Sequence, residues 1–521
     1  MNKRSVKRRR EDDDGSAIAM DRLSQLPQPI LHSILSLLPQ EDAVRTSVLS
    51  KSWRYLWHGR LNFEISDDEL GFIGSKKVWS FIDKTLQRYL DHNFSLQKFQ
   101  VDIYHQEFDS VLLQKWIPVL IMNMGVRSFN ISFHESSIFF PLPLVVFQSE
   151  SLVELHLQGC DLSILKSTDN VMLNNLQTLR LHYVYVTDEL FEKIISGCPL
   201  VENLDFLSCT GIRNCGDRFL CHRNTHFPHL KSLNLHSVKL PAKTFDNFSS
   251  FFPCLSELVL HSCRGLKDFR LFSSSIKRLT IKMNPRKRMK AFIDTPNILY
   301  FKYSDNNDGV LPSIKFRTTS NEWKSKIALR TKLLHSDNDA TSWFLKLNKL
   351  LKGLSQSHIT LRITLYLNSI SNVYQKLHIN DSYGGLYKPV VVEHLKLRGC
   401  HLSYFDSTIL NGFFRICRPR FIQMDLYGKF GAKCDFAEYI SKLLPDETGC
   451  YFGLQDLEEV SIEIRGMKAK EWHCVKGTSL PALRSQHKIR FRLTWKEQLS
   501  NLEDFEAFSA VPIFLKARVE V

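Results

Sequence analysis

The sequence lacks a long apolar segment, and this absence argues against a helix that spans a membrane. The longest apolar run, residues 138–147, is interrupted by Pro141 and Pro143, whereas a membrane helix needs about 18 or more apolar residues in a row. The first residues also lack the apolar core of a signal peptide. We therefore expect no membrane partner and no secretion, and we expect localisation in the nucleus, the cytoplasm or both.

Cysteine is scarce, with 12 residues in 521, which argues against a disulfide-bonded scaffold. No Cys-x-x-Cys pair occurs, so the paired knuckles of a zinc module are missing. The densest group of sulfur and imidazole ligands has loose spacing, and it consists of Cys198, Cys209, Cys215, Cys221, His222, His226 and His229. We expect no metal site and no other cofactor.

Sequence motifs of the common enzyme classes are also missing. There is no phosphate-binding Gly-x-x-x-x-Gly-Lys loop, no Gly-x-Ser-x-Gly elbow and no His-Glu-x-x-His helix. A nucleophilic cysteine paired with a distant histidine stays open, because chance pairs are inevitable in a chain of this composition. The expectation is a protein without catalytic residues.

Basic residues are in excess, with 69 Lys and Arg against 54 Asp and Glu and a formal net charge of +15. This balance favours acidic partners or nucleic acid. Near the N-terminus, Lys7, Arg8, Arg9 and Arg10 precede a run of acidic residues, and such a block stays solvated. It predicts a disordered tail over residues 1–20. Two roles stay open, a nuclear import signal and a charged tail that only increases solubility.

Residues 21–60 contain apolar residues at helical spacing. After Leu26 and Pro27, the apolar positions recur as on one face of a helix that ends before Pro39. A second apolar stripe and a helix around Trp53 follow. About 40 residues are at the margin of what can bury such a surface alone, so we expect another surface to cover it.

This segment resembles the F-box. The resemblance rests on Leu26-Pro27, on the aliphatic helix of Ile30, Ile34 and Leu38, on the Val48-Leu49-Ser50 junction, and on Trp53 within Lys51-Ser52-Trp53-Arg54. It implies binding to a Skp-family adaptor and, through it, to a cullin and a RING protein; apolar anchors on a helix suit such a groove. The implied adaptor-binding residues are Leu26, Pro27, Ile30, Leu31, Ile34, Leu35, Leu38, Val48 and Trp53. The alternative is a helical hairpin that caps the next domain.

A Leu-x-x-Leu-x-Leu pattern repeats along the rest of the chain. Its first positions fall at residues 152, 176, 201, 230, 255, 276 and 298, at intervals within the range of leucine-rich repeats, about 20 to 29 residues. Each repeat supplies one strand and must stack on its neighbours to bury its apolar face. The small residues Cys160, Cys209, Cys263 and Cys400 share one register and should be buried at the inward turn. With a Gly-Cys-Pro phrase at residues 197–199, these repeats are similar to those of plant F-box proteins.

Together these patterns predict an α/β fold class, a short three-helix F-box followed by a leucine-rich-repeat solenoid or horseshoe. The expected segments are a tail at 1–20, the F-box at 21–60, a helical linker or cap at 61–94, repeats at 95–305, and degenerate repeats with a C-terminal cap at 391–521. Residues 306–390 are irregular and unassigned, apart from a strand-like alternation at 358–367. The further C-terminal module of many such plant proteins is not evident.

The resemblance implies a non-catalytic subunit of an SCF-type cullin ubiquitin ligase, which recruits a substrate protein while its partners transfer ubiquitin. Selectivity should lie on the outward side of the strands, where side chains alternate away from the core. The expected substrate-binding positions are mostly basic or protonatable: His156, Arg180, His182, His236, His261, Lys282, Lys396 and Arg398, with Gln158, Asp205, Asn234 and Lys302 at equivalent positions. We hypothesise an acidic or phosphorylated substrate. The alternative is an ordinary solvated sheet face.

A rival function is a nuclear, basic repeat protein that binds nucleic acid. Besides the net charge, it rests on two basic clusters, a loop from Lys282 to Lys290 and a late strand with Lys488, Arg490 and Arg492. Neither cluster shows the aromatic stacking platform of single-strand binders or a recognition helix. A solvated loop and a half-buried strand are therefore the preferred interpretations, and nucleic acid binding is the less favoured function.

Overall fold

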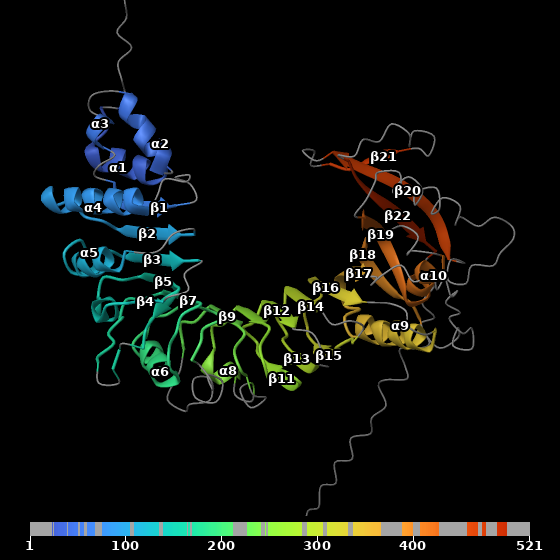
Figure 1. The fold of residues 1–521 in the computed structure, drawn as a ribbon. Helices are drawn as coiled ribbons and strands as arrows, with labels where there is room; N and C mark the ends of the chain where they lie inside the picture. The colour runs from blue at the N-terminus through green and yellow to red at the C-terminus, as the bar shows by residue number, and fades with distance from the viewer. Residues whose placement is uncertain are drawn as a thin grey trace, which may run out of the picture. The chain divides into compact units, whose positions relative to one another are not determined.

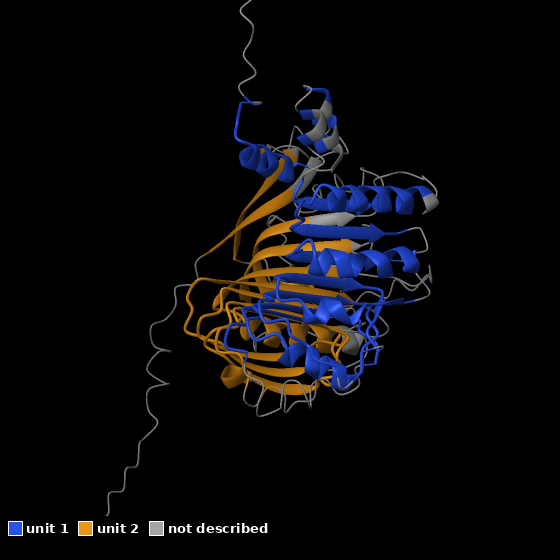
Figure 2. Ribbon diagram, turned by 90° about the vertical axis from the view of Figure 1, so that its left-hand side faces the viewer, with its two compact units in different colours: residues 1–219, 227–234 blue, residues 220–226, 235–521 orange. Residues whose placement is uncertain are grey.

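The computed structural model divides the chain into two compact units, coloured separately in Figure 2. Unit 1 comprises residues 1–219 and 227–234, and unit 2 comprises residues 220–226 and 235–521. The structure describes residues 23, 25–38, 40–49, 53–56, 60–67, 75–104, 109–134, 139–163, 165–166, 169–211, 227–240, 245, 248–283, 289–305, 310–331, 337–365, 388–399, 407–426, 456–466, 471–475 and 487–496. The predicted tail, with Lys7, Arg8, Arg9 and Arg10, lies outside these residues. Among the described helices, none combines the length and the apolar composition that a membrane span requires.

The first part of unit 1 is a small helical segment. It contains α1 (Gln28–Ser36), α2 (Gln40–Arg45), the 3-10 turn η1 (Thr46–Val48) and α3 (Trp53–Leu56). Pro29 stands in the first turn of α1, where its missing N–H removes no helical hydrogen bond. The core consists of Leu31, Leu35, Ala43 and Trp53, against which Leu26, Leu38 and Leu56 pack. The predicted short helices of the F-box segment are thus present.

Parallel strands form the rest of unit 1. They pair in the order β1 (Asn62–Ser66), β2 (Lys98–Ile103), β3 (Ser128–Phe133), β5 (Glu154–Gln158), β7 (Thr178–His182) and β8 (Asn203–Leu207). Figure 1 shows α4 (Ser75–Asp91) and α5 (Ser110–Met122) beside the first of these strands. Phe63, Phe99 and Phe129 stack on successive strands with ring centroids 5.5 and 5.6 Å apart. This repeated inward position is the core of the solenoid.

Three shorter features complete unit 1. They are η3 (Leu144–Gln148), α6 (Asp188–Ser196) and a two-stranded parallel pair of β4 (Phe140–Pro141) with β6 (Cys160–Asp161). Helix α6 begins after Thr187, whose side chain accepts a hydrogen bond from the backbone of Leu190, as expected for an N-cap. Strand β9 (Ser232–His236) contains the boundary to unit 2.

Unit 2 also has a parallel sheet at its centre. Its strands pair in the order β10 (Glu257–His261), β12 (Arg278–Met283), β14 (Tyr300–Asp305), β16 (Trp323–Thr331), β17 (Ser357–Leu365), β18 (Val390–Gly399) and β19 (Cys417–Leu426). The antiparallel strands β22 (His487–Trp495), β20 (Leu457–Gly466) and β21 (His473–Val475) follow. The α/β fold class, an F-box segment followed by stacked repeats, is confirmed.

A second parallel sheet and three helices flank these strands in unit 2. The sheet consists of β11 (Asp268–Phe272), β13 (Lys290–Asp294) and β15 (Ser313–Arg317). The helices are α8 (Phe248–Phe251), α9 (Asp337–Lys352) and α10 (Ser407–Ile416). Helices α9 and α10 pack through Phe344 and Phe413, whose ring centroids lie 5.2 Å apart.

Two segments differ from the sequence-based prediction. Residues 61–94 do contain a helix, but they begin with β1, whose five residues carry only two apolar side chains and gave too short a pattern to detect. Residues 306–390, which we left unassigned, contain β15, β16, α9 and β17. Strands β16 and β17 continue the central parallel sheet, and β15 extends the second sheet. The strand expected at 358–367 is present as β17.

The turns after five neighbouring strands share one backbone conformation. The residue that follows β5, β7, β8, β9 and β10 has a positive φ in every case; these residues are Gly159, Tyr183, Ser208, Ser237 and Ser262. A left-handed residue reverses the direction of the chain at the strand end. The next residue is therefore directed inward, toward the core.

This inward position explains the register of the cysteines. Cys160 and Cys263 are buried, as predicted, whereas Cys209 is only partly buried. Cys400 lies outside the described residues. The thiols of Cys209 and Cys263 donate hydrogen bonds of 3.1 and 3.2 Å to the carbonyl oxygens of Leu181 and Leu235. Burial raises the pKa of both thiols to about 12, so they stay protonated and serve packing.

Candidate functional site

Large apolar side chains are exposed on the F-box helices. Leu37 and Val48 are both 85% exposed, and Leu23, Ile30 and Leu49 are also open to solvent. Large side chains of this kind are normally buried, and a group of them on a monomer marks an interaction surface. We refer to Leu23, Ile30, Leu37, Val48 and Leu49 as the exposed F-box face.

The predicted adaptor-binding residues divide into two groups. Leu31, Leu35 and Trp53 form the internal core of the segment, and Leu26 and Leu38 pack against that core and are half-buried. Pro27, Ile30 and Val48 are exposed, and Ile34 is half-buried. The first group shapes the segment, whereas the second can contact a partner directly. Three exposed residues that were not in the predicted set, Leu23, Leu37 and Leu49, join the second group.

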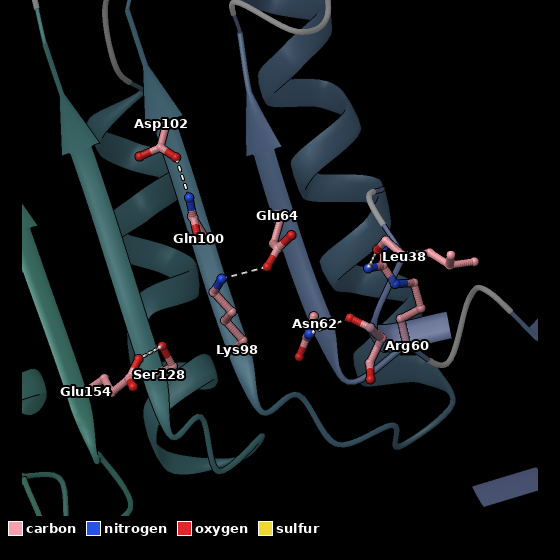
Figure 3. A network of polar contacts seen from close by, with 10 residues as sticks. Leu38, Arg60, Asn62, Glu64, Lys98, Gln100, Asp102, Ser128 and Glu154 are labelled. Carbon is pink, nitrogen blue, oxygen red and sulfur yellow. Dashed lines mark hydrogen bonds and ion pairs between the residues drawn. The ribbon is translucent and has the colours of Figure 1, made fainter. Parts of the chain in front are cut away.

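A buried arginine connects the F-box helices to the first strand of unit 1 (Figure 3). The guanidinium of Arg60 donates a 2.7 Å hydrogen bond to the carbonyl oxygen of Leu38, just after α1. The side-chain amide of Asn62 donates to the carbonyl of Ser36, and the Tyr89 hydroxyl donates to the carbonyl of Arg60. Burial lowers the pKa of Arg60. The bonds from Arg60 and Asn62 satisfy carbonyls at the end of α1 that lack helical partners, and the bond from Tyr89 holds the backbone of Arg60 in place.

The polar face of unit 1 begins with paired charges and amides (Figure 3). Lys98 forms a 2.7 Å ion pair with Glu64 on the neighbouring strand, and Gln100 donates to Asp102. The hydroxyl of Ser128 donates to Glu154. Opposite partners on adjacent strands stabilise a sheet. Lys98 is the one cation among these residues, against the carboxylates of Glu64, Asp102 and Glu154, so the group has no excess positive charge for an acidic ligand.

The predicted residues His156, Arg180 and His182 lie together further along this face. His156 Nε2 is 3.3 Å from His182 Nδ1, and His182 Nε2 is 3.3 Å from a carboxylate oxygen of Asp205. Burial, followed by the proximity of His182 and Arg180, lowers the pKa of His156 to about 4. His156 is therefore neutral at pH 7 and hydrogen bonds without adding charge. Gln158 donates to His134 at 2.8 Å.

In unit 2, the predicted residues His236, His261 and Lys282 follow one another on β9, β10 and β12. The rings of His236 and His261 lie 3.9 Å apart, centroid to centroid. Burial, then the charges of His236 and Lys282, lowers the pKa of His261 to about 4, so this histidine is also neutral at pH 7. At pH 7, His156 and His261 therefore add no positive charge.

Four cations gather on adjacent strands of unit 2. Lys302 on β14 is the register partner of Lys326 on β16, and Arg362 on β17 is the partner of Lys396 on β18. Lys326 faces Thr360, two residues before Arg362. We refer to Lys302, Lys326, Arg362 and Lys396 as the four-cation cluster. Lys326 and Arg362 were missed from the sequence because they lie in the segment that we left unassigned.

The basic residues of the late strand are already engaged. Arg490 and Arg492 both pair with the buried carboxylate of Glu463, at 2.7 Å in the case of Arg492. The guanidinium of Arg490 lies 4.3 Å from the ring centroids of both Phe421 and Trp472. Strand β22 is a half-buried strand, as expected, because Phe491 and Leu493 face the core. The side chain of Lys488 lies outside the described residues.

The loose cysteine and histidine group is only partly described. The thiol of Cys198 donates a 3.1 Å hydrogen bond to the carbonyl of Ile194, and burial raises its pKa to about 12. Cys209 is bound to the backbone as described above. Cys215, Cys221, His222 and His226 lie outside the described residues, as do Arg286, Lys287 and Arg288 of the basic loop.

Two family models match the chain. Residues 23–64 match the F-box domain, and residues 113–216 match a family described as "FBD-associated F-box protein At5g56370, LRR repeats". The first region contains the exposed F-box face. The second contains the strands and turns around Cys160 and Cys209.

Curated proteins of Arabidopsis thaliana are similar over part of their length. F-box/LRR-repeat protein At3g59200 is 35% identical over 197 residues, which cover 36% of each chain. Putative F-box/LRR-repeat protein At5g41840 is 26% identical over 306 residues, 55% of this chain and 50% of that protein. F-box/FBD/LRR-repeat protein At5g22660 is 33% identical over 225 residues, 42% of this chain and 45% of that protein. The chain thus spans half or less of the length of each of these relatives. It carries an F-box domain followed by leucine-rich repeats, as plant F-box/LRR-repeat proteins do, and the predicted resemblance is confirmed.

Proposed function

We propose that this protein is the substrate-recruiting subunit of an SCF-type ubiquitin ligase. The observation that carries the proposal is the exposed F-box face, which lies within the residues that match the F-box domain. The face would dock in a groove of a Skp-family adaptor and, through it, reach a cullin and a RING protein. The leucine-rich repeats would hold the protein to be ubiquitinated.

The energetics of the exposed F-box face support a docking role. Burying an exposed Leu, Val or Ile side chain contributes about 1.5 to 3 kcal/mol, and helix-in-groove recognition uses a few such anchors at helical spacing. The F-box helices already have their own core of Leu31, Leu35, Ala43 and Trp53. The exposed residues are therefore not needed to hold the segment together, and their burial by a partner would be a net gain.

In this role the chain is not itself catalytic. It would raise the effective concentration of a substrate lysine near the charged conjugating enzyme. The charge of unit 2 suits an acidic or phosphorylated substrate, because lysine and arginine pair strongly with carboxylate and phosphate groups. The paired charges at the start of the unit 1 face make that part a weaker candidate for such a substrate.

The test is capture of a purified Skp-family adaptor by the full chain. Val48→Asp places a charge in the exposed F-box face, and we expect it to weaken capture by about 100-fold or more, which corresponds to roughly 3 kcal/mol. Val111→Asp is the matched control, because Val111 is also a helical valine, on α5, and is 78% exposed. Both variants should unfold at the temperature of the unchanged protein. Equal capture by the two variants would refute the docking role of this face.

A further inference from the structure

The four-cation cluster places like charges side by side on four adjacent strands. Neighbouring strands lie about 4.8 Å apart, so the cluster extends over roughly 15 Å of the sheet face. Each of the four residues alternates with buried neighbours, as Lys326 does between Ser325 and Ile327. All four side chains therefore project from the same face, away from the core.

The cations of the cluster lie close enough to perturb one another. Burial, and then the charges of Arg362, Lys302 and Lys396, lowers the pKa of Lys326. The Nε atom of Arg362 is buried and has no hydrogen-bond partner among the described residues. A buried donor without a partner is costly, and clustered groups with perturbed ionisation are typical of binding sites.

Five described carboxylates of unit 2 pair with arginines outside the cluster. The described ion pairs of its strands join Arg278 to Glu257, Arg317 to Asp294, Arg420 to Glu393, Arg418 to Asp456, and Arg490 and Arg492 to Glu463. Within the described residues, none of these pairs includes Lys302, Lys326 or Arg362. In the described part of the chain, these carboxylates therefore leave the charges of Lys302, Lys326 and Arg362 without an ion-pair partner.

We propose that the four-cation cluster binds a phosphorylated side chain of a recruited protein segment. This inference rests on the proposed function, since it names the chemical class of the substrate. A phosphate monoester carries about −1.5 to −2 charges at pH 7 and three acceptor oxygens, so one such group can engage an arginine and two lysines at once. A single carboxylate carries one negative charge and two acceptor oxygens, so it matches such a group of cations less well.

The surroundings of the cluster favour a peptide over a small free phosphate. His394 lies two residues before Lys396 on the same strand, and its ring stacks on Phe421 with centroids 5.1 Å apart. Both rings are only partly buried. This aromatic pair beside the cluster offers contact area to side chains that flank the phosphorylated residue, and a small inorganic phosphate would not use it.

The experiment uses the full chain and a pool of ten-residue peptides with a fixed central phosphoserine and random flanks. The matched pool carries serine. We expect selective retention of the phosphorylated pool, and we expect Lys326→Gln and Arg362→Gln each to weaken the binding of retained peptides by about tenfold or more, as for loss of a charge-assisted hydrogen bond. Lys324→Gln is the matched control, because Lys324 is an exposed lysine two residues away on the same strand and face, and it should change binding less than threefold. Lys326→Arg, which keeps the charge, should retain binding.

Several results would overturn this inference. Equal retention of the two pools would do so, as would equal effects of Lys326→Gln and Lys324→Gln. Binding of pyrophosphate without any phosphopeptide would point to a free phosphate ligand, and tighter binding of a random single-stranded oligonucleotide through the same residues would point to nucleic acid. Adaptor capture, measured on the same variants, depends only on the F-box face and should not change. A failure of the phosphate site is therefore distinguishable from a failure of the ligase role.

Discussion

Gly159 is the position where a single methyl group should disturb the repeats most. It follows β5 with a φ of +70°, and an added Cβ would lie 2.7 Å from the carbonyl oxygen of Phe133. Its N–H donates to the carbonyl of His182, and its own carbonyl accepts from the N–H of Phe140. The residue is thus bonded to elements on both sides, and neither side can move away freely.

The magnitude for Gly159→Ala has two contributions. A left-handed conformation costs an L-residue about 1 to 2 kcal/mol, and forcing extra volume against fixed backbone costs about 1 to 3 kcal/mol more. We expect a loss of roughly 2 to 5 kcal/mol in the free energy of unfolding. Gly125→Ala is the matched control: Gly125 has a φ of +66°, but an added Cβ would meet nothing within 4 Å. Gly125→Ala should lower the free energy of unfolding only by the cost of the left-handed conformation, about 1 to 2 kcal/mol.

The assay is urea unfolding combined with amide hydrogen exchange. Both glycines lie in unit 1, so exchange in β3, β5 and β7 should accelerate in Gly159→Ala, while exchange in β12 of unit 2 serves as an internal reference. A Gly159→Ala protein that is no less stable than Gly125→Ala would show that the Phe133 carbonyl moves away at little cost. The reasoning about the close approach would then be wrong.

Two further predictions concern buried polar groups of unit 1. Arg60→Met removes the hydrogen bond to the carbonyl of Leu38. It should lower the free energy of unfolding by about 1 to 3 kcal/mol and accelerate amide exchange in α1 but not in α5. Unchanged exchange in α1 would contradict the connection between Arg60 and this helix. His156 has a folded pKa of about 4, below the ordinary value of about 6.5, so the unfolded chain binds more protons between these values. Stability should therefore fall as the pH decreases from 6.5 to 4, by at most about 1.4 kcal/mol per pH unit and by less after solvent screening. In urea titrations, His156→Gln should reduce this slope, and an unchanged slope would exclude His156 as its source.

Helical periodicity was sufficient to find the F-box segment but not to divide its residues between core and surface. Leu35 and Leu38 occupy the same apolar stripe, yet Leu35 is fully buried and Leu38 is half-buried. Leu37 belongs to the same apolar run and is almost entirely exposed. The division depends on where α2 and α3 pack on α1, and short helices with turns between them do not reveal this packing through spacing alone.

The repeat pattern predicted the inward cysteines but not the backbone that directs them. Cys160 and Cys263 are buried because a left-handed residue precedes each of them. Gly159 signals a positive φ in the sequence, because glycine adopts this conformation readily. Tyr183 and Ser262 also have a positive φ, but their residue types do not indicate it. Stacking of one repeat on the next imposes this conformation, and only comparison of several repeats in register would have suggested it.

The distribution of charge is what the sequence could least predict, and it decides where a substrate can bind. Alternation along a strand shows which residues face outward, but neutralisation depends on the residues opposite them on neighbouring strands. In unit 1, Lys98 faces outward and is neutralised by Glu64 across the strand pair. In unit 2, Lys326 also faces outward, but its partner Thr360 carries no charge and the next residue on that face is Arg362. The formal charge of +15 is therefore not spread evenly over the surface. We expect an acidic ligand to bind preferentially where cations on neighbouring strands lie side by side.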